Sequence, residues 1–199
     1  MTSATYADVL RPQTRAAAWL YDAAMIVGGT VLVALSAQFA FRLPFTPVPI
    51  TLQTLTVLLV GLLLGSTRGS ISMLLYLAQG LAGLPVFAFG GAGAAYFLGP
   101  TGGYLIGFVL AAYLTGRLAE RGWDRRIMTT ILALVVGTVA IYTCGLIWLA
   151  VYLRAENVLA VGLYPFIPGA LVKIAAAAIL YPQGWKLLHS KEKDREEAG

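Results

Sequence analysis

Residues 127–153, IMTTILALVVGTVAIYTCGLIWLAVYL, run for 27 residues without a charged side chain. A helix of about 20 apolar residues is long enough to cross the hydrocarbon core of a bilayer. Working outward along the chain, similar apolar blocks fall at about 18–41, 50–66, 69–84, 102–119 and 165–188. The sequence therefore predicts an all-α integral membrane protein, with six transmembrane helices in a single domain over residues 1–199.

The composition of the whole chain agrees with a membrane protein. Apolar residues make up 59% of the 199 residues and charged residues 12%, and the mean hydropathy is +0.79. Soluble domains average about 45–50% apolar and about 25% charged residues. The formal net charge is +5, but the Lys and Arg residues are scattered between the apolar blocks. A nucleic-acid-binding protein would cluster them on one surface or arm, so this class is not expected.

The distribution of basic residues predicts the orientation in the membrane. With a cytoplasmic N-terminus, eleven of the 14 Lys and Arg residues fall in cytoplasmic segments, whereas only Arg42 and Arg154 fall outside. The remaining one, Lys173, lies within the last apolar block. Because basic residues accumulate on the cytoplasmic side of membrane proteins, both termini are expected there. Residues 189–199, HSKEKDREEAG, are expected to form a charged cytoplasmic tail.

Two connections on the predicted outer side are unusual. The first, FRLPFTPVPI at 41–50, has three prolines within six residues, which exclude a helix. The second, GLPVFAFGGAGAAYFLGPTGG at 83–103, is rich in glycine and aromatic residues and has no charge. Irregular backbone at membrane depth occurs only where protein buries it or where it lines a cavity. We expect these two connections to form a pocket that opens to the outside.

Lys173 is the isolated charge in YPFIPGALVKIAAAAIL, residues 164–180. A lysine near the centre of a membrane helix costs about 2.5–3.5 kcal/mol on insertion scales, so such residues usually face an interior or a cavity. One alternative is that the side chain extends to the outer membrane interface. The other is that the ammonium binds an anionic ligand, most simply a carboxylate.

For two groups of small and aromatic residues, the sequence leaves open whether they bind a ligand or partner or only pack within the membrane. In GPTGGYLIGF, residues 99–108, the glycines could expose backbone N–H groups to a ligand or could allow close helix packing. Nearby aromatic residues could form the walls of a ligand site or a membrane-interface belt; these are Phe87, Phe89, Tyr96 and Tyr104. Near residues 30–40, the small side chains of Thr30, Ala34, Ala37 and Ala40 could pack internally or could dock a separate membrane subunit.

Several catalytic patterns are absent from the sequence. There is no GxxxxGK[ST] nucleotide-binding loop, no GxSxG or HExxH motif, and no carboxylate pair within the apolar blocks. The single cysteine, Cys144, and the single histidine, His189, do not make an ordinary metal site. We therefore expect neither an enzyme nor a metal centre.

Three segments together resemble a known family. They are LSAQFAFRLPFTPVPITLQTLTVLLVGLLLG, LYLAQGLAGLPVFAFGGAGAAYFLGPTGGYLIGF and PFIPGALVKIAAAAIL. These segments, within about residues 30–185, are similar to the BioY family, the biotin-specific S components of energy-coupling-factor (ECF) transporters. The resemblance implies a six-helix subunit in the plasma membrane of a prokaryote, in contact with lipid, that captures biotin from outside and has no cofactor. Its protein partners would be a transmembrane coupling protein and two ATPase subunits.

The resemblance also implies roles for individual residues. Lys173 matches the family's lysine, but the acidic residue that the family commonly carries three positions earlier, in PGDxxK, is Ala170 here. The expected ligand-binding residues are Lys173, Gln53, Phe89, Tyr96, Thr101, Gly102, Gly103, Tyr104 and Phe166. The expected docking residues for the coupling protein are Thr30, Ala34 and Ala37. Two alternative functions stay open. The chain could be an S component for another small carboxylated vitamin, or it could be a non-catalytic membrane scaffold.

Overall fold

The computed structural model describes residues 5–153 and 157–197, so Arg154 lies outside the described residues. The described chain is almost entirely helical, with one short antiparallel ribbon that pairs Ala40 with Thr51. In chain order the elements are α1 (Tyr6–Val9), α2 (Arg15–Gln38), β1 (Ala40–Phe41), β2 (Ile50–Thr51), α3 (Gln53–Leu81), η1 (Ala88–Gly90), α4 (Gly93–Phe97), α5 (Gly102–Ala119), α6 (Ile127–Leu153), α7 (Val158–Gly162), η2 (Tyr164–Phe166) and α8 (Ile167–Glu197).

Within the described residues, five helical segments are long and apolar enough to cross a membrane. They are α2, α3, α5, α6 and the segment Val158–Trp185, which includes most of α8. The predicted bounds of two spans, 102–119 and 127–153, coincide with α5 and α6. The prediction of an all-α membrane protein is confirmed, whereas the count of six spans differs from these five segments.

The difference in count arises at α3. The predicted spans 50–66 and 69–84 form one helical element, in which Gly65 alone leaves helical geometry, with φ 82° and ψ 177°. The Gln53 side chain donates a 2.6 Å hydrogen bond to the Tyr76 hydroxyl. In a straight helix these residues would be about 35 Å apart, at a rise of 1.5 Å per residue. The element therefore folds back at Gly65 into two halves, one for each predicted span, and six spans stay a prediction.

The fold-back at Gly65 depends on contacts from α5 and from Glu120, which directly follows α5. The backbone N–H of Ser66 starts the second half of α3, and it donates a 2.7 Å hydrogen bond to Glu120 Oε1. The Ser66 hydroxyl donates to the same oxygen, also at 2.7 Å. A Cβ on Gly116 would lie 2.3 Å from the Ser66 nitrogen, so only glycine allows α5 to approach this closely.

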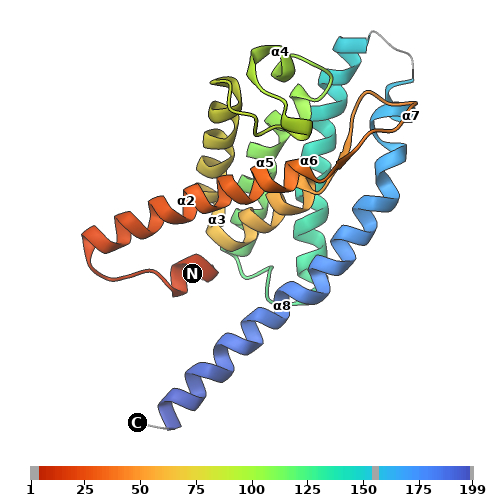
Figure 1. Ribbon diagram of the computed structural model, residues 1–199. Coiled ribbons are helices and arrows are strands. Elements are labelled where there is room, and N and C mark those ends of the chain that lie inside the picture. Colours follow the sequence, from red (N-terminus) through yellow and green to blue (C-terminus); the bar gives the residue numbers. More distant parts are fainter. Residues whose placement is uncertain (1–4, 154–156, 198–199) are drawn as a thin grey trace.

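The polar contacts place several distant segments at one end of the helix bundle. Arg68, just after the fold-back, forms ion pairs of 2.8 Å with Asp8 and Asp22. Trp185 on α8 donates a 2.8 Å hydrogen bond to Asp124, in the connection between α5 and α6. Burial raises the pKa of the Asp124 carboxyl. This is the end that the basic residues predict to be cytoplasmic, and the β ribbon, η1 and α4 lie at the other (Figure 1).

The helix α8 has one face toward the bundle and one face away from it. Ile174, Ala177 and Ala178 are buried, whereas Leu171, Val172 and Leu180 are 63%, 70% and 67% exposed, as expected for a surface in contact with lipid. The helix continues to Glu197, so residues 189–197 of the expected tail are helical. These last turns project beyond the other helices (Figure 1).

Candidate ligand-binding site

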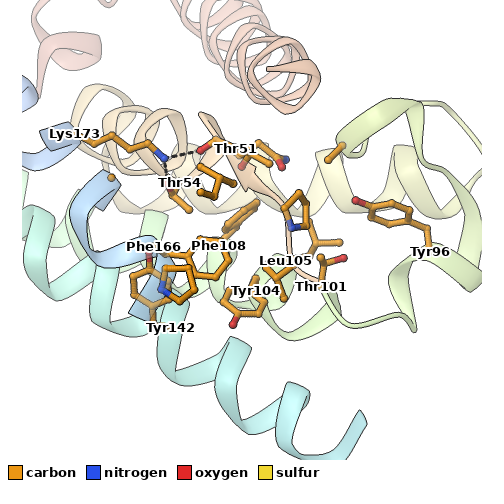
Figure 2. A pocket seen from close by; sticks show the side chains of 17 residues that line it. Thr51, Thr54, Tyr96, Thr101, Tyr104, Leu105, Phe108, Tyr142, Phe166 and Lys173 are labelled. Atoms are coloured by element: carbon orange, nitrogen blue, oxygen red, sulfur yellow. Dashed lines mark hydrogen bonds between the residues drawn. The ribbon is translucent and has the colours of Figure 1, made fainter. Parts of the chain in front are cut away.

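One pocket lies between the β ribbon, the start of α3, the connection before α5, and helices α5, α6 and α8. Figure 2 shows that its lining brings together residues from widely separated parts of the chain. Those labelled there are Thr51, Thr54, Tyr96, Thr101, Tyr104, Leu105, Phe108, Tyr142, Phe166 and Lys173. The pocket is mostly apolar, with a few polar groups, which is the usual composition of small-molecule sites.

Lys173 points into this pocket from the inward face of α8. Its ammonium donates hydrogen bonds to the carbonyl oxygen of Thr51 at 2.5 Å and to the hydroxyl of Thr54 at 3.0 Å (Figure 2). An ammonium has three N–H donors, so one remains for a ligand. The side chain therefore does not extend along the outer surface of the helix toward the membrane interface.

Gln53 supplies an open acceptor in the lining of the same pocket. Its Nε2 donates to the Tyr76 hydroxyl, which in turn donates to the carbonyl oxygen of Val86 at 3.0 Å. Gln53 Oε1 forms no hydrogen bond with any residue in the described ranges, and the side chain lines the pocket. This oxygen is available to an N–H group of a ligand.

Tyr96 and Thr101 lie at the end of the pocket away from Lys173 (Figure 2). The ring of Tyr96 stacks on Phe87, with centroids 5.0 Å apart. Phe87 is fully buried, and a Cβ on Gly80 would lie 2.0 Å from its ring. The glycine-rich connection thus folds inward and lines a cavity, as the sequence predicts. Burial raises the pKa of the Tyr96 hydroxyl.

Apolar side chains form the long walls between the two polar ends. Leu105 and Phe108 come from α5 and Phe166 from η2, while Tyr142 comes from α6. Tyr104 also lines the pocket, and its hydroxyl donates a 2.7 Å hydrogen bond to the carbonyl oxygen of Gly162. These walls suit a largely apolar ligand body with a polar group at each end.

Several lining residues were missed by the sequence analysis. Thr51 and Thr54 flank Gln53 within the PITLQT segment, so that motif contained the information. Phe108 follows Tyr104 by four positions and Leu105 by three, so helical spacing places Phe108 beside each of them on α5. Tyr142 had no comparable indication, because α6 is apolar around its whole circumference.

Three of the expected ligand-binding residues do not line this pocket. Phe89 is 43% exposed and lies in a shallower cavity nearer the predicted outer surface. Gly102 and Gly103 pack against Trp148 on α6, and a Cβ on Gly103 would lie 2.2 Å from the Trp148 Cβ. These two glycines therefore allow close helix packing, and they do not line the ligand pocket.

Two of the three expected docking residues, Thr30 and Ala37, are buried within the chain. Thr30 and Ala37 have 0% exposure, and Ala34 is half-buried. The Thr30 hydroxyl donates a 2.9 Å hydrogen bond to the carbonyl oxygen of Ser72 on α3. Thr30 therefore packs against α3 and Ala37 lies inside the chain, whereas docking through the half-buried Ala34 stays a prediction.

No group of three or more His, Cys, Asp or Glu side chains that could hold a metal ion occurs within residues 5–153 and 157–197, as far as their side chains are described. The described lining of the pocket contains no carboxylate. Its chemistry is therefore one cation, several hydroxyl and amide groups, and aromatic walls. This arrangement can bind an anionic organic molecule, and it offers no pair of groups for acid–base catalysis.

Comparisons with known proteins agree with this reading. The model of the BioY family matches residues 8–190. A biotin transporter BioY from Rhizobium etli is 37% identical over 75% of this chain and 84% of that protein. A probable biotin transporter BioY from Pyrococcus horikoshii is 42% identical over 67% of this chain and 78% of that protein.

A solved structure shows the same fold. The crystal structure of the S-component for biotin from an ECF-type ABC transporter matches with a TM-score of 0.75 and 29% sequence identity. The match covers 88% of this chain and 95% of that one. The relatives are transporters, so the chain is a transport protein rather than an enzyme, and it is a multi-pass membrane protein. The chain belongs to the BioY family of biotin transporters.

Proposed function

We propose that this chain is the substrate-binding S component of an ECF transporter in the plasma membrane of a prokaryote. It captures biotin at the outer face and releases it inside when a transmembrane coupling protein and two ATPases act on it. The observation that carries the proposal is the pocket itself, with the Lys173 ammonium near one end and the open Gln53 acceptor in its wall.

Biotin matches the chemistry of this pocket group by group. Its carboxylate would pair with the remaining N–H donor of Lys173, because a charge-assisted hydrogen bond is the strongest contact available there. The ureido N–H groups would donate to Gln53 Oε1, and the apolar ring system would lie against Phe108 and Tyr142. Ala170 provides no carboxylate for Lys173, and the backbone carbonyl of Thr51 and the hydroxyl of Thr54 accept from the ammonium instead.

The energy for release must come from partner subunits, since the sequence has no nucleotide-binding loop. We place the docking surface on the exposed face of α2, opposite the buried Thr30 and Ala37. This face carries Val31 and Leu35, which are 47% and 58% exposed. A Cβ added at Gly28 would meet no atom within 4 Å, so a partner helix could approach closely there.

A split between binding and uptake tests this proposal. Gly28→Trp fills open space, so it should leave the affinity of the purified protein for biotin within about twofold of wild type. In cells that supply the coupling protein and ATPases, the same variant should lower biotin uptake at least about tenfold. The matched control is Leu180→Trp, at a 67% exposed position on α8, which should change neither quantity.

The outcome separates the two halves of the proposal. Loss of uptake with retained binding supports docking through α2. Full uptake by Gly28→Trp would place the coupling protein on another surface. Failure of the wild-type protein to bind biotin would contradict the proposed substrate.

A further inference from the structure

A second cavity lies directly outside the ligand pocket and is continuous with its lining. Pro49, Tyr96 and Thr101 line both cavities. The outer one is also lined by Arg42, in the proline-rich connection, and by Phe89 of η1. We call this outer cavity the vestibule. Its position places it on the path from the predicted outer surface to the pocket.

Arg42 is the cation of the vestibule. Its guanidinium lies over the ring of Phe89, 4.4 Å from the ring centroid. Within the described residues it forms no ion pair and no hydrogen bond, and no carboxylate lines the vestibule or the pocket. Stacking on a ring occupies the flat face of a guanidinium and leaves the N–H donors at its edge free. Those donors match the two oxygens of a carboxylate.

The ring that supports Arg42 is itself held in place. Phe89 has a left-handed backbone conformation, with φ 59° and ψ 31°, which is unusual for a residue other than glycine. Gln38 at the end of α2 fixes this turn from both sides. Its Oε1 accepts a 3.1 Å hydrogen bond from the Gly90 N–H, and its Nε2 donates to the carbonyl oxygen of Phe87 at 3.2 Å. Arg42 thus rests on a positioned platform.

We propose that the vestibule is a capture site for carboxylate-bearing ligands. The ligand carboxylate pairs first with Arg42, then the ligand passes between Pro49, Tyr96 and Thr101, and Lys173 receives the carboxylate. The exposed guanidinium is screened by water and binds weakly, so it releases the ligand readily. The half-buried ammonium of Lys173 holds the anion more tightly. This inference rests on the proposed function and adds a first step to it.

The test is the association rate constant of biotin, measured by stopped-flow fluorescence on purified protein. A charge at the rim of a site changes association more than dissociation. Arg42→Gln should lower the association rate constant for biotin about three- to tenfold and change the dissociation rate constant less than twofold. Biotin methyl ester, which has no charge, should associate equally fast with Arg42→Gln and wild type. Raising the salt concentration should slow wild type more than the variant.

Two control variants make the result interpretable. Arg126→Gln removes the same charge at the opposite end of the bundle and should leave association unchanged. Arg42→Lys keeps a positive charge and should retain most of the wild-type rate, even though its stacking on Phe89 is altered. Equal biotin association by Arg42→Gln and wild type would overturn the proposal. Equal slowing of biotin and its ester would also overturn it, because Arg42 would then act only by supporting the fold.

Failure of the proposed function gives a different result. In that case wild-type protein does not bind biotin at all. The role of Arg42 is then tested with the carboxylated ligand that the protein does bind, by comparing how fast this ligand and its methyl ester associate with wild type and Arg42→Gln.

Discussion

At the scale of single residues, the proposed ligand binding depends on how Lys173 is held. Its isolation among apolar residues predicted a position in a cavity, and the structure places it there. The two groups that accept its hydrogen bonds, Thr51 and Thr54, are 122 and 119 positions away in the sequence. Such partners depend on how the β ribbon and α3 fold against α8. Composition and spacing alone contain no information about that contact.

At the same scale, the open acceptor of Gln53 predicts a loss of biotin affinity when this side chain is replaced. Gln53→Leu removes the one side-chain amide oxygen in the described lining, so the ureido N–H groups of biotin lose an acceptor in a buried site. Loss of a buried hydrogen-bond partner costs about 1–3 kcal/mol, and we expect biotin affinity to fall at least about fivefold. Isothermal titration calorimetry measures this, with Gln183→Leu, at an exposed position on α8, as the matched control. Unchanged affinity of Gln53→Leu would exclude this contact.

At the scale of elements, α3 and α2 show what the sequence could and could not predict. Hydropathy divided residues 50–84 into two apolar blocks, and the fold-back at Gly65 lies near the end of the first block, 50–66. The Glu120 carboxylate that accepts from Ser66 was not predictable, because it comes from another helix. On α2, the sequence identified the small residues but did not show that Thr30 and Ala37 are buried within the chain. Small side chains favour close approach of any helix, and here that helix is α3 of the same chain.

The close packing of α5 against the fold-back predicts that a larger side chain at Gly116 destabilises the protein. A methyl group on Gly116 would overlap the backbone at Ser66, whereas one on Gly28 would meet no atom within 4 Å. Overpacking of this kind costs about 1–3 kcal/mol. Gly116→Ala should therefore lower the thermal unfolding midpoint of the detergent-solubilised protein by several degrees. The same substitution at Gly28, also within a helix, should leave the midpoint unchanged or raise it, and equal midpoints for both variants would contradict the close packing at Gly116.

At the scale of the whole molecule, the two ends of the bundle have different chemistry. The ion pairs of Arg68 gather at one end, and the pocket with its vestibule opens at the other. The basic residues of the sequence predicted this polarity, since charges in connections follow the membrane orientation. The sequence also predicted that both unusual connections line one site. It did not predict which of their side chains face inward, because that depends on the turn at Phe89 and the stacking of Tyr96 on Phe87.

The most direct test of the account is a titration of wild type and Lys173→Ala with biotin and with biotin amide. Removing one partner of a desolvated charged contact costs about 2–5 kcal/mol, so Lys173→Ala should weaken biotin binding roughly 30-fold or more. Wild type should prefer biotin to its amide by a similar factor, the variant should lose that preference, and Lys191→Ala should behave as wild type. If Lys173→Ala keeps wild-type affinity and wild type binds both ligands equally, the ammonium does not contact the ligand, and this pocket does not recognise biotin through its carboxylate.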